Sequence, residues 1–228
     1  MPILYNIGVA LAKGAFGAFG RYEVEGRQKV PRRGPLIVVA NHMSNGDPPV
    51  VIAAVPRHMF MMAKRGLFAG SLVTRILSDV GVHPLDRDGR DAAALLWGVR
   101  LVKQGNAVLF FPEGTRSKDA RLHRGKTGAA YAALKTGAPV LPVGVMGTEN
   151  IPGLLRVAMP LCHVRVKIGE PFTLPEPEGP ITRELLERMT DVIMERIAAL
   201  LPEEYRGYYA SRVEGRRATA SGDGDRPA

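Results

Sequence analysis

Residues 36–48 read LIVVANHMSNGDP, and this stretch decides more about the chain than any other. It opens with five apolar residues, Leu36 to Ala40, in which β-branched side chains dominate, as is typical of a buried strand. A histidine and an aspartate, His42 and Asp47, follow directly, and two prolines come after the aspartate. Proline suits the first positions of a helix. The stretch therefore predicts a buried strand that ends in a polar loop and leads into a helix.

The histidine and the aspartate of this loop suit acid–base chemistry. An imidazole is the side chain best placed to take a proton from a hydroxyl near neutral pH. A nearby carboxylate can hold the other ring nitrogen and stabilise the imidazolium that forms. We interpret His42 as a general base and Asp47 as its orienter, with the nucleophilic hydroxyl supplied by a substrate. Taken alone, the pair also fits a hydrolase, a metal site or a buried structural pair.

Strands and helices alternate on both sides of this stretch. Strands are expected at residues 22–26, 36–40, 58–63, 81–85, 107–111, 139–146 and 163–168, and helices at 47–55, 67–80, 90–104, 125–136 and 181–201. This alternation predicts an α/β fold: a single layered domain over residues 21–210, with a mixed, partly parallel sheet flanked by helices. Residues 211–228 consist largely of Gly, Ser, Ala and charged residues and predict a disordered tail.

The first 20 residues form an apolar segment of their own. One helical stripe collects Ile3, Ile7, Leu11 and, roughly, Gly14 and Ala18. The segment is too short and too interrupted for a membrane span, and it lacks the layout of a cleaved signal peptide. Two interpretations stay open: a helix that lies in the headgroup region of a membrane, and a helix packed on the protein's own core.

Charge and composition limit the classes of molecule that the chain is expected to bind. The formal net charge of +9 and the pI near 10.0 point to an anionic partner: nucleic acid, anionic lipid headgroups or a phosphorylated small substrate. Little aromatic interleaving and no recognition motif argue against nucleic acid. The single cysteine, Cys162, excludes an internal disulfide and a cysteine-rich zinc site. No convincing third ligand accompanies His42 and Asp47, so we expect no bound metal.

A second polar loop, FPEGTRS at residues 111–117, follows the strongest predicted strand. Arg116 can bind a phosphate through two nitrogens, and Gly114 would let backbone amides approach an anion. Lys64 and Arg87 follow two other predicted strands and are further candidate phosphate ligands. Each of these residues alone is more simply a solvated surface residue. Their shared position after strands, where α/β sheets bind ligands, favours a common site.

Four blocks in fixed order resemble the 1-acyl-sn-glycerol-3-phosphate acyltransferase family, the lysophosphatidic acid acyltransferases. The first block, N-H-x-x-x-x-D, is matched by Asn41, His42 and Asp47. The third block is matched at every position, by Phe111, Pro112, Glu113, Gly114, Thr115, Arg116 and Ser117. Residues 83–87, HPLDR, resemble the second block, and Pro142 with its neighbours loosely matches the fourth. The chain departs from the family pattern at His83 and Pro84, where apolar residues are more common.

The resemblance implies transfer of an acyl group from acyl-CoA or acyl-carrier protein to the free hydroxyl of 1-acyl-glycerol-3-phosphate, giving phosphatidic acid in phospholipid biosynthesis. His42 would be the base and Asp47 its orienter, and no acyl-enzyme would form. Residues Glu113, Gly114, Thr115 and Arg116 would bind the acceptor, with Arg87 and Lys64 on its phosphate. No bound cofactor is expected, since the acyl thioester is a substrate.

The resemblance leaves the acceptor open. Glycerol-3-phosphate or a lyso-aminolipid could be acylated by the same mechanism, although Arg87 and Arg116 favour an acceptor that carries phosphate. The expected partners are the lysophospholipid, the thioester, an acyl-carrier protein and a membrane surface, and not nucleic acid. An apolar N-terminal helix on a basic protein predicts a peripheral or monotopic location on the cytoplasmic face of the cell membrane.

Overall fold

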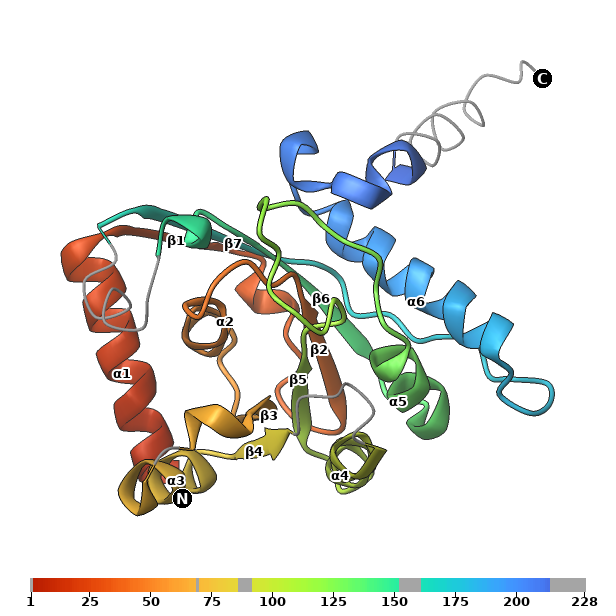
Figure 1. The fold of residues 1–228 in the computed structure, drawn as a ribbon, viewed down its shortest axis with the longest axis horizontal. Helices are drawn as coiled ribbons and strands as arrows, with labels where there is room; N and C mark the ends of the chain where they lie inside the picture. The colour runs from red at the N-terminus through yellow and green to blue at the C-terminus, as the bar shows by residue number, and fades with distance from the viewer. Residues whose placement is uncertain (1, 69, 86–91, 152–160, 214–228) are drawn as a thin grey trace.

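A seven-stranded sheet forms the centre of the molecule in a computed structural model that describes residues 2–68, 70–85, 92–151 and 161–213 (Figure 1). The strands lie in the order β1-β7-β6-β2-β5-β3-β4. They are β1 (Arg21–Glu25), β2 (Leu36–Ala40), β3 (Met59–Lys64), β4 (Val82–Leu85), β5 (Ala107–Phe110), β6 (Val140–Met146) and β7 (His163–Ile168). All neighbours are parallel except the antiparallel pair of β6 and β7. The predicted mixed, partly parallel sheet is confirmed.

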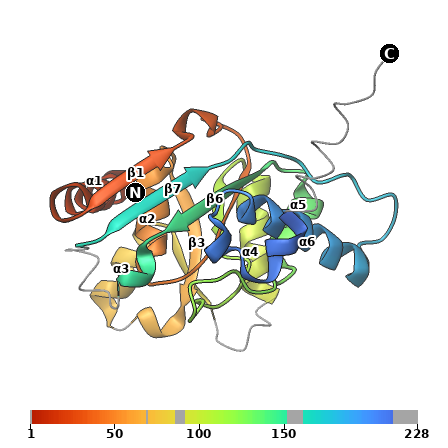
Figure 2. The same ribbon diagram turned by 90° about the horizontal axis from the view of Figure 1, so that it is seen from above.

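Helices cover both faces of this sheet (Figure 1). They are α1 (Pro2–Phe19), α2 (Asp47–Ala54), α3 (Ser71–Asp79), α4 (Ala92–Lys103), α5 (Gly128–Thr136) and α6 (Arg183–Ala198). The first three lie on one face, and α4, α5 and α6 lie on the other. Figure 2 shows the edge of the sheet at which β1, β7 and β6 run side by side. The molecule is therefore a three-layer α/β structure around one sheet.

The central strand β2 contributes to both apolar cores. Leu36 and Val38 pack in the cluster beneath α1 and α2, whereas Ile37 and Val39 pack in the cluster beneath α4, α5 and α6. Successive side chains of a strand point to opposite faces of the sheet, so a strand covered on both faces must be apolar at every position. All five residues of β2 are fully buried, which explains the continuous apolar run.

Helix α1 packs on the protein's own core with one side and leaves the predicted apolar stripe exposed on the other, so its place in a membrane stays a prediction. Tyr5 and Phe16 are buried, and the Tyr5 hydroxyl donates a hydrogen bond to the backbone carbonyl of Arg57. The predicted stripe lies on the other side, where Ile3, Ile7 and Leu11 are 73%, 50% and 69% exposed. Among the described residues, no helix has the length and hydropathy needed to cross a bilayer.

Several predicted boundaries differ from the structure by one to four residues, and two of the differences have a clear cause. The helix expected over residues 67–80 begins only at Ser71, because Gly70 has a φ of 85° and interrupts the helical backbone. The tail predicted from residue 211 begins too early, since Val213 is buried and Arg212 pairs with Asp191 at 2.6 Å. Residues 214–228 lie outside the described part of the chain.

Candidate active site

Four adjacent parallel strands bring the predicted site residues to one edge of the sheet. Strand β2 leads into the loop with His42 and Asp47, and its neighbour β5 leads into residues 111–117. Lys64 ends β3, on the far side of β5, and Thr148 follows β6, on the other side of β2. The carboxyl ends of parallel strands lie at the same edge of a sheet, which is where α/β folds bind ligands.

The histidine and the aspartate form the predicted pair. His42 Nδ1 lies 2.7 Å from Asp47 Oδ2. The Asp47 side chain is fully buried, whereas the imidazole is 18% exposed. Because Nδ1 faces the carboxylate, the ring nitrogen left to accept a proton is Nε2, for which the described residues supply no hydrogen-bond partner. This geometry suits a base whose second nitrogen is held by a carboxylate.

The carboxylate of Asp47 is itself fixed by several donors. Oδ2 accepts the backbone N–H groups of Met43 at 2.6 Å and Ser44 at 2.7 Å, in addition to the imidazole. Oδ1 accepts the hydroxyl of Thr148 at 2.5 Å. Asp47 also lies in the first turn of α2, where a helix favours negative charge. With donors on both oxygens, the carboxylate can hold the imidazole in one orientation.

The 111–117 loop makes three contacts with His42. The backbone N–H of His42 donates to Glu113 Oε1 at 2.9 Å, and its carbonyl accepts the backbone N–H of Ser117 at 2.7 Å. The ring of Phe111 stacks on the imidazole, with 4.2 Å between centroids and 26° between planes. The two polar loops found in the sequence are therefore parts of one structure.

Glu113 has a different environment from the one expected of an acceptor ligand. Its side chain is only 4% exposed, and its second oxygen, Oε2, accepts the backbone N–H of His123 at 3.1 Å. Burial raises the pKa of this carboxyl, and the hydrogen bonds from the backbone of His42 and His123 oppose that rise. Contact between Glu113 and the acceptor stays a prediction. In the structure, its carboxylate joins the backbone of His42 to the segment that carries His123.

The next three residues of the loop are open to solvent. Gly114, Thr115 and Arg116 are exposed. Gly114 has a φ of 66°, and a Cβ there would lie 2.6 Å from the Cδ atom of Lys126. The Lys126 side chain therefore crosses the loop at this glycine. The sequence motifs did not predict this lysine, which lies at the start of the helix expected over residues 125–136, just before the observed α5.

The structure describes two of the three predicted phosphate ligands, Arg116 and Lys64. Arg116 makes no ion pair within the described ranges, and Lys64 is exposed at the carboxyl end of β3. Arg87 lies outside the described residues, so its role stays a prediction. Lys126 adds an exposed cation that the motifs did not predict.

The motif residues that support the site make structural contacts. The Asn41 side chain donates to the carbonyl of Val145 at 2.8 Å and accepts its N–H at 2.7 Å, which ties the end of β2 to β6. The Pro112 carbonyl accepts the N–H of Lys126 at 2.7 Å. Pro142 is paired with Val39 in the sheet. These contacts position the loops without providing chemical groups of their own.

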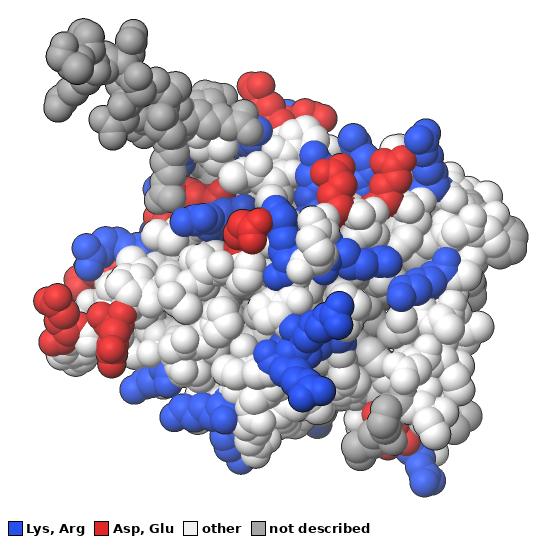
Figure 3. Space-filling view, turned by 180° about the vertical axis from the view of Figure 1, so that it is seen from behind, with Lys and Arg blue, Asp and Glu red and all other residues white. Residues whose placement is uncertain are grey.

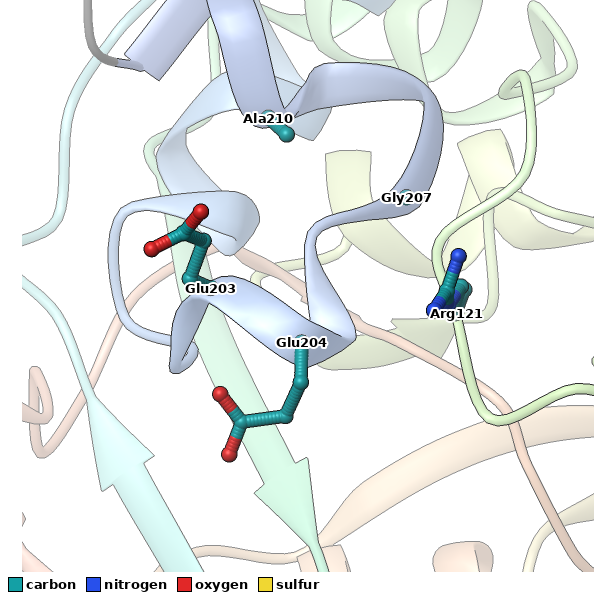
Figure 4. A pocket seen from close by; sticks show the side chains of 5 residues that line it. All are labelled: Arg121, Glu203, Glu204, Gly207 and Ala210. Atoms are coloured by element: carbon teal, nitrogen blue, oxygen red, sulfur yellow. The ribbon is translucent and has the colours of Figure 1, made fainter.

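A surface hollow lies between Arg121 and the segment 203–210 (Figure 4). It is lined by Arg121, Glu203, Glu204, Gly207 and Ala210. Backbone hydrogen bonds join Leu122, next to Arg121, to Tyr205 and Tyr208. None of its lining residues belongs to the predicted site, and its charges are mixed, so it is not the candidate active site.

Comparison with known proteins identifies the family. A model of the acyltransferase family matches residues 21–146, the segment that contains β1 to β6 and both polar loops. The chain belongs to the acyltransferase family. The resemblance inferred from the four blocks is confirmed, and the family match contains His42 and Asp47.

Relatives of this acyltransferase share one name. The 1-acyl-sn-glycerol-3-phosphate acyltransferase BAT2 of Brassica napus chloroplasts is 39% identical over 136 residues, covering 58% of this chain and 39% of that protein. The Salmonella typhimurium 1-acyl-sn-glycerol-3-phosphate acyltransferase is 30% identical over 170 residues, covering 73% and 69%. The chain thus matches less than half of the length of the plant relative.

A solved structure supports the same assignment. The crystal structure of the Thermotoga maritima 1-acyl-sn-glycerophosphate acyltransferase, PlsC, superposes with a TM-score of 0.67 at 27% identity. The superposition covers 94% of this acyltransferase and 80% of that chain. The shared fold therefore extends well beyond the 21–146 segment that the family model matches.

Proposed function

We propose that this protein transfers an acyl group from a thioester to the free hydroxyl of 1-acyl-glycerol-3-phosphate and so forms phosphatidic acid. The observation that carries the proposal is the His42–Asp47 pair at 2.7 Å, held against the 111–117 loop. The relatives are named for this reaction, and the His42–Asp47 pair would provide the base that the reaction needs.

The reaction needs no covalent enzyme intermediate. His42 Nε2 takes the proton of the acceptor hydroxyl as its oxygen attacks the thioester carbonyl carbon, and the charge of Asp47 stabilises the imidazolium. The tetrahedral intermediate then collapses with cleavage of the C–S bond. The thiolate leaves and takes up the proton from His42, so the base is restored. Because a thiolate departs easily, the histidine needs to supply little acid assistance.

Exposed cations beside the pair suit the acceptor phosphate. A phosphate monoester carries about two negative charges near neutral pH. Arg116 is exposed on the same loop that holds His42, and Lys126 crosses that loop at Gly114. We propose that both bind the acceptor phosphate, together with Lys64 and with Arg87. A guanidinium can form two parallel hydrogen bonds to phosphate oxygens, which would orient the acceptor for attack.

The substrates carry acyl chains, so we propose that the protein works at the cytoplasmic face of the cell membrane as a peripheral or monotopic protein. The outward stripe of α1, with Ile3, Ile7 and Leu11, would lie among the headgroups. Figure 3 shows a face on which Lys and Arg side chains are more widespread than acidic ones. Positive charge of this kind attracts anionic lipid, and it would also attract an acidic acyl-carrier protein as donor.

An assay of the purified protein tests the reaction, the acceptor and the donor together. The protein is given 1-acyl-glycerol-3-phosphate, glycerol-3-phosphate or a lyso-aminolipid, each with acyl-CoA or acyl-carrier protein, and the lipid products are identified by mass spectrometry. The proposal expects phosphatidic acid from the first acceptor. Acylation of another acceptor instead, or of none, would overturn it.

Two histidine variants test the mechanism in the same assay. His42→Ala should abolish transfer because it removes the base. His123→Ala is the matched control, since His123 also pairs with a carboxylate, Asp119, at 2.9 Å but is half exposed. The control should keep near-normal turnover. Near-normal turnover by His42→Ala would show that His42 is not the general base.

A further inference from the structure

Thr148 contacts the side chain of Asp47 and lies outside all four sequence blocks. It follows β6, just past the segment that the family model matches. Its hydroxyl donates to Asp47 Oδ1, and the residue is fully buried. We propose that Thr148 is a positioning residue, which fixes the Asp47 carboxylate so that its other oxygen faces His42. The inference rests on the proposed function, because it assigns Thr148 a part in the same acyl transfer.

The donors on Asp47 are divided unevenly between its two oxygens. Oδ2 accepts the imidazole and two backbone N–H groups. Oδ1 accepts the Thr148 hydroxyl, the only donor to this atom within the described part of the chain. Without that hydroxyl, one oxygen of a buried carboxylate would lack a donor, which is costly for a charged group. The carboxylate would then be free to turn and to weaken its hold on the imidazole.

The backbone places Thr148 at this position by a turn that requires glycine. Gly147 has a φ of 86°, and a Cβ there would lie 2.0 Å from the carbonyl oxygen of His163 in β7. Strand β6 is tied to the end of β2 by the two hydrogen bonds of Asn41. The turn after β6 therefore lies beside the loop after β2, and the hydroxyl bonds to Oδ1, the carboxylate oxygen that the histidine does not contact.

Burial separates this role from substrate binding. Thr148 is 0% exposed, so it cannot touch the acceptor or the thioester and can act only through Asp47. Changing it should therefore alter the chemical step and leave binding of both substrates nearly unchanged. The loss of the hydroxyl should change the orientation and the tautomer of His42, which Asp47 holds.

The first experiment measures steady-state kinetics of Thr148→Val, which keeps the shape and removes the hydroxyl. We expect kcat to fall about 10- to 100-fold, the factor for a lost hydrogen bond to a charged group, with the KM of both substrates within about twofold. Thr148→Ser should restore most of the activity. Thr190→Val is the matched control, since Thr190 is 3% exposed and its hydroxyl bonds to the Leu186 carbonyl in α6.

The second experiment asks whether the effect passes through Asp47. In an Asp47→Ala background, Thr148→Val should cause no further loss of kcat, because the group on which Thr148 acts is gone. If the double variant lost kcat by the product of the two single-variant factors, the proposal would be overturned. Wild-type kcat in the single Thr148→Val variant would also overturn it. A drop that Thr148→Ser fails to restore would also overturn it.

A third readout does not depend on turnover. Heteronuclear NMR of the histidine ring nitrogens reports which nitrogen of neutral His42 carries the proton. We expect Nδ1 to carry it in the wild type, and we expect the Nε2–H tautomer to increase in Thr148→Val. An unchanged tautomer would overturn the positioning role. If the wild type transfers no acyl group at all, the proposed function fails, whereas this measurement still decides the role of Thr148.

Discussion

Replacing Asp47 with asparagine should lower kcat strongly without disturbing the fold. Three donors converge on Oδ2, from His42, Met43 and Ser44, so an asparagine must place its carbonyl oxygen there and not its NH2 group. Its NH2 group then faces Thr148, whose hydroxyl can turn and accept a hydrogen bond. Every hydrogen bond of the aspartate is thereby replaced. We expect the midpoint of thermal unfolding to change by no more than about 3 °C.

What Asp47→Asn removes is the negative charge beside the imidazolium of the transition state. Two unit charges about 4 Å apart interact by about 4 kcal/mol at an effective dielectric constant of about 20. At about 1.4 kcal/mol for each factor of ten, kcat should fall about 1,000-fold. The positive charge on His42 appears only during the reaction, so the KM values of acceptor and donor should change little.

The assay follows release of the free thiol from an acyl-CoA donor, alongside thermal unfolding of the same protein. Asp191→Asn is the matched control, because Asp191 also accepts a hydroxyl hydrogen bond, from Tyr209 at 3.1 Å, but lies on α6. The control should keep its turnover. A folded Asp47→Asn protein with less than about a tenfold loss of kcat would refute the electrostatic reasoning. A large fall in thermal stability would refute the claim that asparagine fits the site.

Three other perturbations test separate parts of the structure. Glu113→Ala removes the acceptors of two backbone N–H groups and should lower kcat about tenfold or more, whereas a rise confined to the acceptor KM would show that Glu113 binds substrate. Gly147→Ala should lower the melting temperature clearly more than Gly137→Ala: both have positive φ, but only the first places a Cβ against a backbone oxygen, at 2.0 Å, so equal losses would contradict the turn described. Ile7→Ser should reduce co-sedimentation with anionic vesicles, and the equally exposed Leu96→Ser on α4 should not; equal losses would show that α1 is not the contact.

The strand and the loop of the opening stretch could be predicted because their signals are local. Five consecutive apolar residues rich in β-branched side chains are typical of a strand that is covered on both faces. The histidine and the aspartate lie five positions apart in one loop, so their contact needs only a turn between them. The same holds for the alternation of strands and helices, from which the α/β class follows.

Boundaries were less predictable where a local backbone conformation or a distant contact decided them. The start of α3 depended on the positive φ of Gly70, which an apolar helical pattern does not reveal. The end of the domain depended on Arg212 and Val213, whose partners lie in the core and on α6. Composition alone placed both residues in the tail.

The sequence by itself determined that this chain is an α/β protein with a histidine, an aspartate and an arginine-bearing polar loop after its strands. Only the tertiary structure decided how these parts meet. Thr148 lies 101 positions from Asp47, and it reaches the carboxylate because β6 pairs with β2. The carboxylate of Glu113 turns toward the backbone of His42, 71 positions away, because β5 is the other neighbour of β2. Local patterns specify which groups are present, whereas strand order, which depends on burial of the whole sheet, specifies which of them touch.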